Sequence, residues 1–202
     1  MDNASPQSAS SNSFARRELK VWSIYLLTII SAIFVHEIGH CIPAWINGVT
    51  AIPTPAKEYI LDDVSSSLQQ KISLCGLLAT FLFSIGIMIL YLVNISKYES
   101  AMLAGALVNP GIYSLRFILV GRGHDGTEFQ EAQAALGLNY SGNSIDWFLF
   151  ALFIVGIMIW IYKSRPPFKA LSRLFIGLII ALIFVIALQV ANNAIFDPIF
   201  QS

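Results

Sequence analysis

The feature that most constrains this chain is a cluster of three ionisable side chains inside a long apolar segment. His36, Glu37 and His40 lie in a run that begins near Val21 and continues through Trp45. An ionisable side chain at membrane depth costs several kcal/mol, so a cluster this dense indicates a function rather than packing. Residues four apart share one face of a helix, so both imidazoles can reach one metal ion.

The spacing of these residues is that of the H-E-x-x-H arrangement, in which two histidines bind zinc and the glutamate is the general base. Glu37 follows His36 by about a quarter-turn of a helix, close enough to reach a water on the metal without being a ligand. The alternative is a chance match on a solvated helix, which the hydrocarbon surroundings disfavour. The sequence therefore predicts Zn²⁺ as the cofactor, His36 and His40 as metal ligands, and Glu37 as the catalytic base.

The composition of the chain is that of a membrane protein. Of its 202 residues, 56% are hydrophobic and only 12% are charged, whereas a soluble domain has about 25% charged residues. The net charge is zero and no basic block is present, which argues against nucleic acid as a partner. We therefore expect an integral multi-pass membrane protein with the lipid bilayer as its surroundings.

Five apolar segments satisfy the length criterion of about 20 residues for a transmembrane helix. They cover residues 21–46, 70–93, 101–120, 146–162 and 171–191. The third segment is interrupted by Asn109-Pro110-Gly111. The expected fold is an all-α polytopic membrane protein with about five transmembrane helices, of which the first three form a catalytic core.

Three regions follow from this pattern. Residues 1–18 are expected to be a disordered cytoplasmic tail, because the start of the chain is rich in Ser, Asn and Ala. Residues 19–140 are expected to be the protease core with the metal site, and residues 141–202 two additional transmembrane helices. Most of the basic residues that flank the spans fall on the same side of the membrane as the N-terminus. This bias predicts a cytoplasmic N-terminus in a cell membrane, plasma or inner.

The segment 48–70 is too polar to span a membrane. Pro53 and Pro55 exclude a regular helix there, and residues 58–61 have the composition of an extended segment. The sequence leaves open whether this segment is re-entrant, interfacial or a plain connector. The role of the last two spans is equally open between a gate, a contact between copies of the chain in a homo-oligomer, and simple packing.

A second group of polar residues follows the third span. Catalytic zinc has three protein ligands and one open position, so the histidine pair needs a third partner. Asp125 is the first candidate, with His124 and Glu128 as the alternatives. The first and third spans run in the same direction, which brings both groups toward one membrane face. Asp125 also fits as the N-cap of a helix over 127–136, with Glu128 completing a capping box.

Two other charged residues lie near this group. Arg116 is close to the outer end of the third span, where its side chain can snorkel to the interface or steady a negatively charged oxygen. Glu131 continues the polar face of the helix expected over 127–136, and we expect it to be solvated.

These motifs together resemble the site-2 protease family of intramembrane zinc metalloproteases. The stretch from His36 to His40, followed by Ala44 and Gly48-Val49, is similar to the first signature of that family. His124-Asp125-Gly126 resembles its Leu-Asp-Gly signature. The resemblance implies that Asp125 is the third zinc ligand.

The segment Cys75–Thr80 is similar to the Gly-Pro-x-x-Asn segment in the middle helix of the same family. Gly76 matches that pattern, whereas Leu77 and Thr80 replace the usual proline and asparagine. The resemblance implies a zinc metalloendopeptidase that hydrolyses peptide bonds in or near transmembrane segments of membrane-anchored protein substrates.

Two other functions are compatible with the sequence. One is a catalytically inactive relative that keeps the metal site and binds metal or client proteins. The other is a different class of membrane zinc protease, such as the prenyl-protein processing enzymes, which resemble this chain at the first motif and take their third ligand from a downstream glutamate. The choice between Asp125 and Glu128 as the third ligand discriminates the two protease classes.

Overall fold

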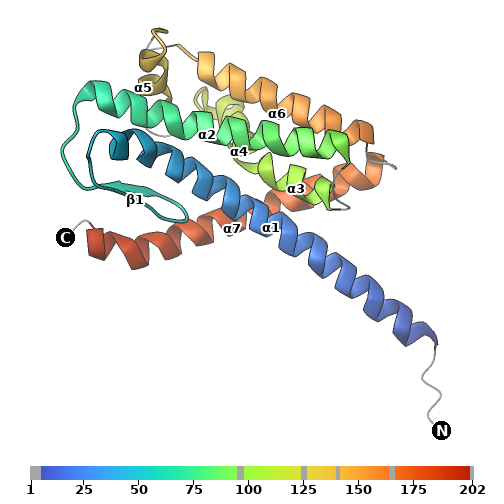
Figure 1. Ribbon diagram of the computed structural model, residues 1–202. Coiled ribbons are helices and arrows are strands. Elements are labelled where there is room, and N and C mark those ends of the chain that lie inside the picture. The colour runs from blue at the N-terminus through green and yellow to red at the C-terminus, as the bar shows by residue number, and fades with distance from the viewer. Residues whose placement is uncertain (1–5, 95–97, 124–126, 140–141, 164–166, 201–202) are drawn as a thin grey trace.

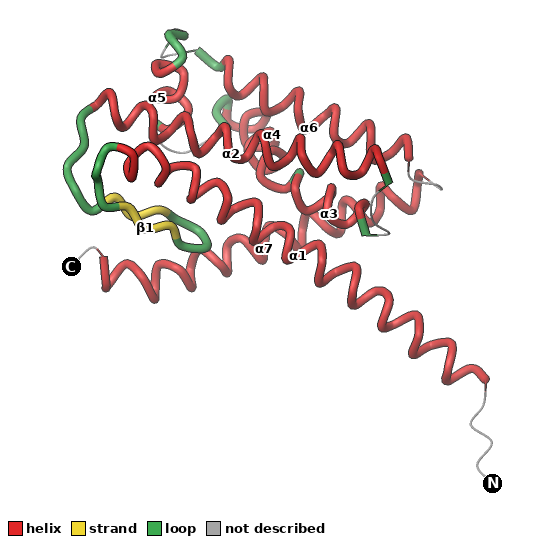
Figure 2. The backbone as a smooth tube through the Cα atoms, in the orientation of Figure 1, coloured by secondary structure: helices red, strands yellow, loops and turns green. Residues whose placement is uncertain are grey.

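Helices account for most of the chain in the computed structural model, which describes residues 6–94, 98–123, 127–139, 142–163 and 167–200. Within these ranges the helices are α1 (Pro6–Ile46), α2 (Ser66–Val93), α3 (Glu99–Ala106), α4 (Val108–Val120), α5 (Glu128–Ala135), α6 (Ser144–Lys163) and α7 (Pro167–Phe200). Two short strands, β1 (Ala51–Pro53) and β2 (Glu58–Ile60), lie between α1 and α2 (Figures 1 and 2).

Four of these helices are long and apolar enough to cross a membrane. Their spanning parts are Arg16–Ile46, Ser66–Val93, Ser144–Lys163 and Phe175–Phe200. The pair α3 and α4 forms a fifth candidate, bent by 40° at its break. The expectation of a helical fold with about five helices long and apolar enough to span a membrane is confirmed, and the bent pair corresponds to the interrupted third span. A catalytic core formed by the first three spans stays a prediction. The membrane type and the direction of the N-terminus stay predictions.

The bend between α3 and α4 follows from Pro110. A proline has no amide hydrogen, so Pro110 cannot bond the carbonyl of Ala106 four residues earlier. In the structure Ser84 of α2 donates its hydroxyl to that carbonyl at 3.1 Å, and this serine is fully buried. A neighbouring helix thus satisfies the backbone group that the proline frees, as a hydrocarbon environment requires.

The first helix begins earlier than the sequence indicated. Residues 6–18, expected as part of the disordered tail 1–18, are helical, and α1 extends away from the bundle at this end (Figure 1). Pro6 occupies the first helical position, where its fixed φ favours helix initiation. The segment 15–20 contains Ala, Arg, Glu, Leu and Lys, which are strong helix formers that continue into the apolar run.

A close approach of α1 and α2 brings the histidines of α1 against α2. At Gly39 a Cβ atom would lie 2.6 Å from the Cβ of Ala79 and 2.6 Å from the carbonyl oxygen of Cys75. Only a residue without a side chain fits at this contact, which is the usual role of small residues between membrane helices. The backbone carbonyls of α2 are therefore within reach of side chains on α1.

The polar segment after α1 forms an antiparallel hairpin, whose second strand lies within the extended stretch expected at 58–61. Ala51 pairs with Ile60 and Pro53 pairs with Glu58. The hairpin is attached to the end of α7, because Tyr59 donates its hydroxyl to Asp197 at 2.7 Å and Lys57 Nζ lies 3.2 Å from the same carboxylate. Figure 1 shows the hairpin between the end of α1 and the end of α7.

The contact at Gly39 makes a testable prediction about stability. Gly39→Ala places a methyl group against backbone and Cβ atoms of α2, and overpacking of this kind costs about 1–3 kcal/mol. We expect a lower midpoint of unfolding for the detergent-solubilised protein, measured by thermal or denaturant unfolding. Gly86→Ala on α2 is the control, because a Cβ there meets no heavy atom within 4 Å. Equal midpoints for the two variants would contradict the close approach.

Candidate metal centre

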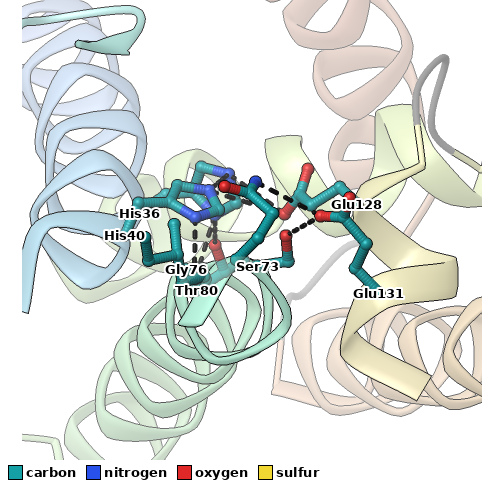
Figure 3. A network of polar contacts seen from close by, with 9 residues as sticks. His36, His40, Ser73, Gly76, Thr80, Glu128 and Glu131 are labelled. Atoms are coloured by element: carbon teal, nitrogen blue, oxygen red, sulfur yellow. Dashed lines mark hydrogen bonds and ion pairs between the residues drawn. The ribbon is translucent and has the colours of Figure 1, made fainter. Parts of the chain in front are cut away.

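Two imidazoles on α1 face each other at the centre of the candidate site. His36 and His40 are one helical turn apart and are 5% and 3% exposed. Their rings are edge-to-face at 86°, and the two Nε2 atoms are 3.0 Å apart (Figure 3). The predicted placement of this pair on one face of a helix is confirmed.

Hydrogen bonds to α2 determine which ring nitrogens are free. His36 Nδ1 lies 2.9 Å from the carbonyl oxygen of Gly76 and 2.9 Å from Thr80 Oγ1, and His40 Nδ1 lies 2.9 Å from the carbonyl oxygen of Ile72. A carbonyl can only accept, so Nδ1 of each neutral ring carries the hydrogen. Each Nε2 then presents a lone pair, and two lone pairs converge on one point.

Gly76 makes room for this arrangement on α2. A Cβ atom at this position would lie 2.2 to 2.6 Å from three atoms of the His40 ring. The glycine therefore allows the imidazole to lie against the backbone of α2, where its Nδ1 reaches the carbonyl oxygen of Ile72. The glycine that the sequence analysis matched to the Gly-Pro-x-x-Asn segment therefore has a physical role here, because it leaves room for the ring of His40.

A carboxylate from α5 completes a group of three donor atoms. Glu128 Oε1 lies 3.5 Å from His40 Nε2 and 3.7 Å from His36 Nε2, and its side chain is only 12% exposed. The three donor atoms all lie within 4.8 Å of one another. Two imidazole nitrogens and one carboxylate oxygen are a donor set of catalytic zinc sites. These residues fit a zinc ion, because a cation would offset the lone pairs and the negative charge that face one point.

The catalytic base predicted from the sequence lies in the same place. Glu37 is 6% exposed, and its carboxyl group lies close to that of Glu58 of β2. Glu37, His40 and Glu58 form a second group of donor atoms within 4.8 Å of one another. Glu58 was not identified from the sequence, because only the fold of the hairpin brings a residue 21 positions downstream back to Glu37.

The preferred third ligand of the sequence analysis is not placed. Asp125 and its alternative His124 lie outside the described residues, so Asp125 as a ligand stays a prediction. Glu128, the remaining alternative, is the residue that the structure brings to the histidine pair. The helix expected over 127–136 is present as α5, with Thr127 at its N-cap.

The site opens into a cleft of about 520 Å³. Its lining comes from α1, the hairpin, α2, α4, the start of α5 and α7, and it includes both apolar and charged side chains. Arg116 of α4 and Lys57 of the hairpin supply positive charge to the lining, while Ile33, Ile112 and Val185 supply apolar surface. The cleft therefore has both charged and apolar walls, and it can accommodate a ligand that has polar and apolar parts.

Comparisons with protein-family models, with curated proteins and with solved structures found no match to this chain.

The hydrogen bond at Thr80 makes a prediction about metal affinity. Thr80→Val removes the hydroxyl beside His36 Nδ1 and conserves the volume of a side chain that is 1% exposed. Loss of such an outer-shell partner lowers metal affinity by about 10–100-fold, and we expect the lower end because Gly76 still accepts from the ring. Competition titration of Zn²⁺ against a chelating dye measures this. Thr80→Ser keeps the hydroxyl and should bind as the wild type does. Equal affinity of the Val variant would show that the hydroxyl plays no part.

Proposed function

We propose that this protein is a zinc-dependent intramembrane endopeptidase that hydrolyses peptide bonds in or near transmembrane segments of membrane-anchored proteins. The observation that carries the proposal is the convergence of His36 Nε2, His40 Nε2 and Glu128 Oε1 within a bundle of apolar helices. Glu37 lies in the same cleft. The proposal agrees with the resemblance of the H-E-x-x-H segment to the site-2 protease family.

The roles of the residues follow from their places in the cleft. His36, His40 and Glu128 would hold Zn²⁺, which when bound polarises a carbonyl and lowers the pKa of a water ligand toward about 7. Glu37 takes the proton of the attacking water and passes it to the leaving amine. Arg116 lines the same cleft, and a cation there stabilises negative charge that develops on the carbonyl oxygen.

The substrate class follows from the position of the site among apolar helices. A transmembrane helix has its carbonyl groups hydrogen-bonded within the helix, so it must unwind locally before a carbonyl can be attacked. We therefore propose substrates with helix-weakening residues in or near the membrane segment. The polar lining contributed by the hairpin supports access of water from that side of the cleft.

The identity of the third ligand separates two protease classes. The family resemblance implies Asp125, whereas the contact of Glu128 with both imidazoles favours a downstream glutamate, as in the prenyl-protein processing enzymes. The reaction is the hydrolysis of an amide in both cases. A metal-binding protein without protease activity is the remaining candidate, and the presence of Glu37 beside the metal ligands argues against it.

The role of Glu37 is tested by Glu37→Gln. The amide cannot take a proton, and general-base catalysis contributes about 10²–10⁴-fold to a rate. We expect cleavage of a fluorescent transmembrane substrate to fall by at least this factor, with the zinc content of the purified protein unchanged. Glu18→Gln, near the other end of the spanning part of α1, is the control and should retain activity. Activity retained in Glu37→Gln would exclude this residue as the base.

The third ligand is tested by comparing Glu128→Ala with Asp125→Ala. Removing a direct ligand should weaken zinc binding by more than the roughly 10–100-fold effect of an outer-shell change. We expect this loss in Glu128→Ala and a smaller one in Asp125→Ala, measured as zinc per protein after dialysis against graded chelator. The reverse order would assign the site to Asp125. Equal zinc content in wild type, both variants and His36→Ala would contradict the metal site.

A further inference from the structure

The carboxylate of Glu131 links the start of α5 to α2, next to the candidate metal site. Its Oε2 accepts a hydrogen bond from Ser73 Oγ at 2.5 Å and one from Gln69 Nε2 at 3.3 Å. Its Oε1 accepts from Thr127 Oγ1 at 3.0 Å. Figure 3 shows the Ser73 hydroxyl reaching Glu131 beside Glu128. The expectation that Glu131 is merely solvated is therefore wrong.

These hydrogen bonds restrict how the first turn of α5 can lie. A carboxylate only accepts, and here both of its oxygens have defined donors. The donors come from two different places, since Gln69 and Ser73 belong to α2 and Thr127 is the N-cap of α5 itself. Charge-assisted hydrogen bonds of this kind are about twice as strong as neutral ones. Ser73 is also buried at 2% exposure, so its position is set by the packing of α2.

The same helix α2 also orients the histidine pair. The carbonyls of Ile72 and Gly76 receive the Nδ1 hydrogens of His40 and His36, while Ser73, next in sequence to Ile72, donates to Glu131. Glu131 and Glu128 are three residues apart and therefore share one face of α5. One short stretch of α2 thus sets the positions of both imidazoles and, through Glu131, of the carboxylate that faces them.

We infer that Glu131 is a positioning residue, which holds Glu128 against the two histidines and so sets the affinity of the site for a divalent metal ion. This inference rests on the proposed function, because it takes Glu128 as a metal ligand. Without Glu131 the first turn of α5 loses its hydrogen bonds to Ser73 and Gln69 of α2. The carboxylate of Glu128 is then less firmly held in the geometry in which its oxygen faces both Nε2 atoms.

Other contacts attach α5 to the bundle independently of Glu131, which separates positioning from stability. Gln133 donates to the carbonyl of Gly142 at 2.8 Å and accepts from the amide of Ser144 at 2.7 Å. Phe129 and Ala132 are buried in the hydrophobic core. Because these contacts remain when Glu131 is replaced, the helix should stay docked, and only the hydrogen bonds that fix the acidic face of its first turn are lost. The expected effect is therefore on metal binding rather than on folding.

The test measures binding of Co²⁺, a spectroscopic substitute for Zn²⁺, to the full chain in detergent. We expect Glu131→Ala to bind about 10–100-fold more weakly than wild type, the effect of an outer-shell change, with an altered visible spectrum and an unchanged unfolding midpoint. Glu131→Gln should recover most of the affinity, because its amide oxygen still accepts from Ser73. Gln130→Ala, the adjacent position on α5, is the matched control and should bind as wild type.

Ser73→Ala gives a second route to the same conclusion. It should weaken Co²⁺ binding in the same direction as Glu131→Ala, and the double variant should bind no more weakly than Glu131→Ala alone, because both act through one contact. Wild-type affinity and spectrum in Glu131→Ala, or additive losses in the double variant, would overturn the positioning role. Absence of Co²⁺ binding by the wild type would instead reject the proposed function, and with it this inference.

Discussion

The hydrogen bonds from two imidazoles on α1 to the backbone of α2 are the interaction on which the candidate site depends. Each Nδ1 faces a carbonyl oxygen of α2 at 2.9 Å, so both Nε2 atoms face inward. Carbonyls within a helix already accept one hydrogen bond and keep a second lone pair for this purpose. The arrangement needs the two helices to be nearly in contact, which the glycines at 39 and 76 permit.

The donors from α5 and the hairpin are then placed around this pair. Glu128 comes from α5, at the place where Glu131 of the same helix accepts a hydrogen bond from Ser73 of α2. Glu58 comes from β2 and lies beside Glu37. The hairpin is in turn attached to the last helix through Asp197. Segments from most of the chain therefore meet at one cleft, and the long apolar helices act as the frame that brings short polar segments together.

Several parts of this arrangement could be predicted from residue patterns. Length and hydropathy indicated the long apolar helices, and Pro110 indicated an interruption in the third span, which the structure places at the break before Val108. The spacing of the histidines predicted their shared face. The tail over 1–18 was predicted wrongly from residue 6 onward, because its polar composition outweighed the helix-forming residues next to the first span.

The sequence by itself determined that this chain forms helices long and apolar enough to span a membrane, with an imidazole pair and a glutamate within the first of them, because periodicity and hydrophobicity are local properties. Only the tertiary structure decided which distant groups meet that pair. Glu58, Glu131 and the carbonyls of α2 had no signal in the sequence, since a hairpin, a short helix and backbone atoms gain their roles only through packing. The contact of Glu128 with the two imidazoles, one of three alternatives in the sequence, likewise depends on where α5 lies.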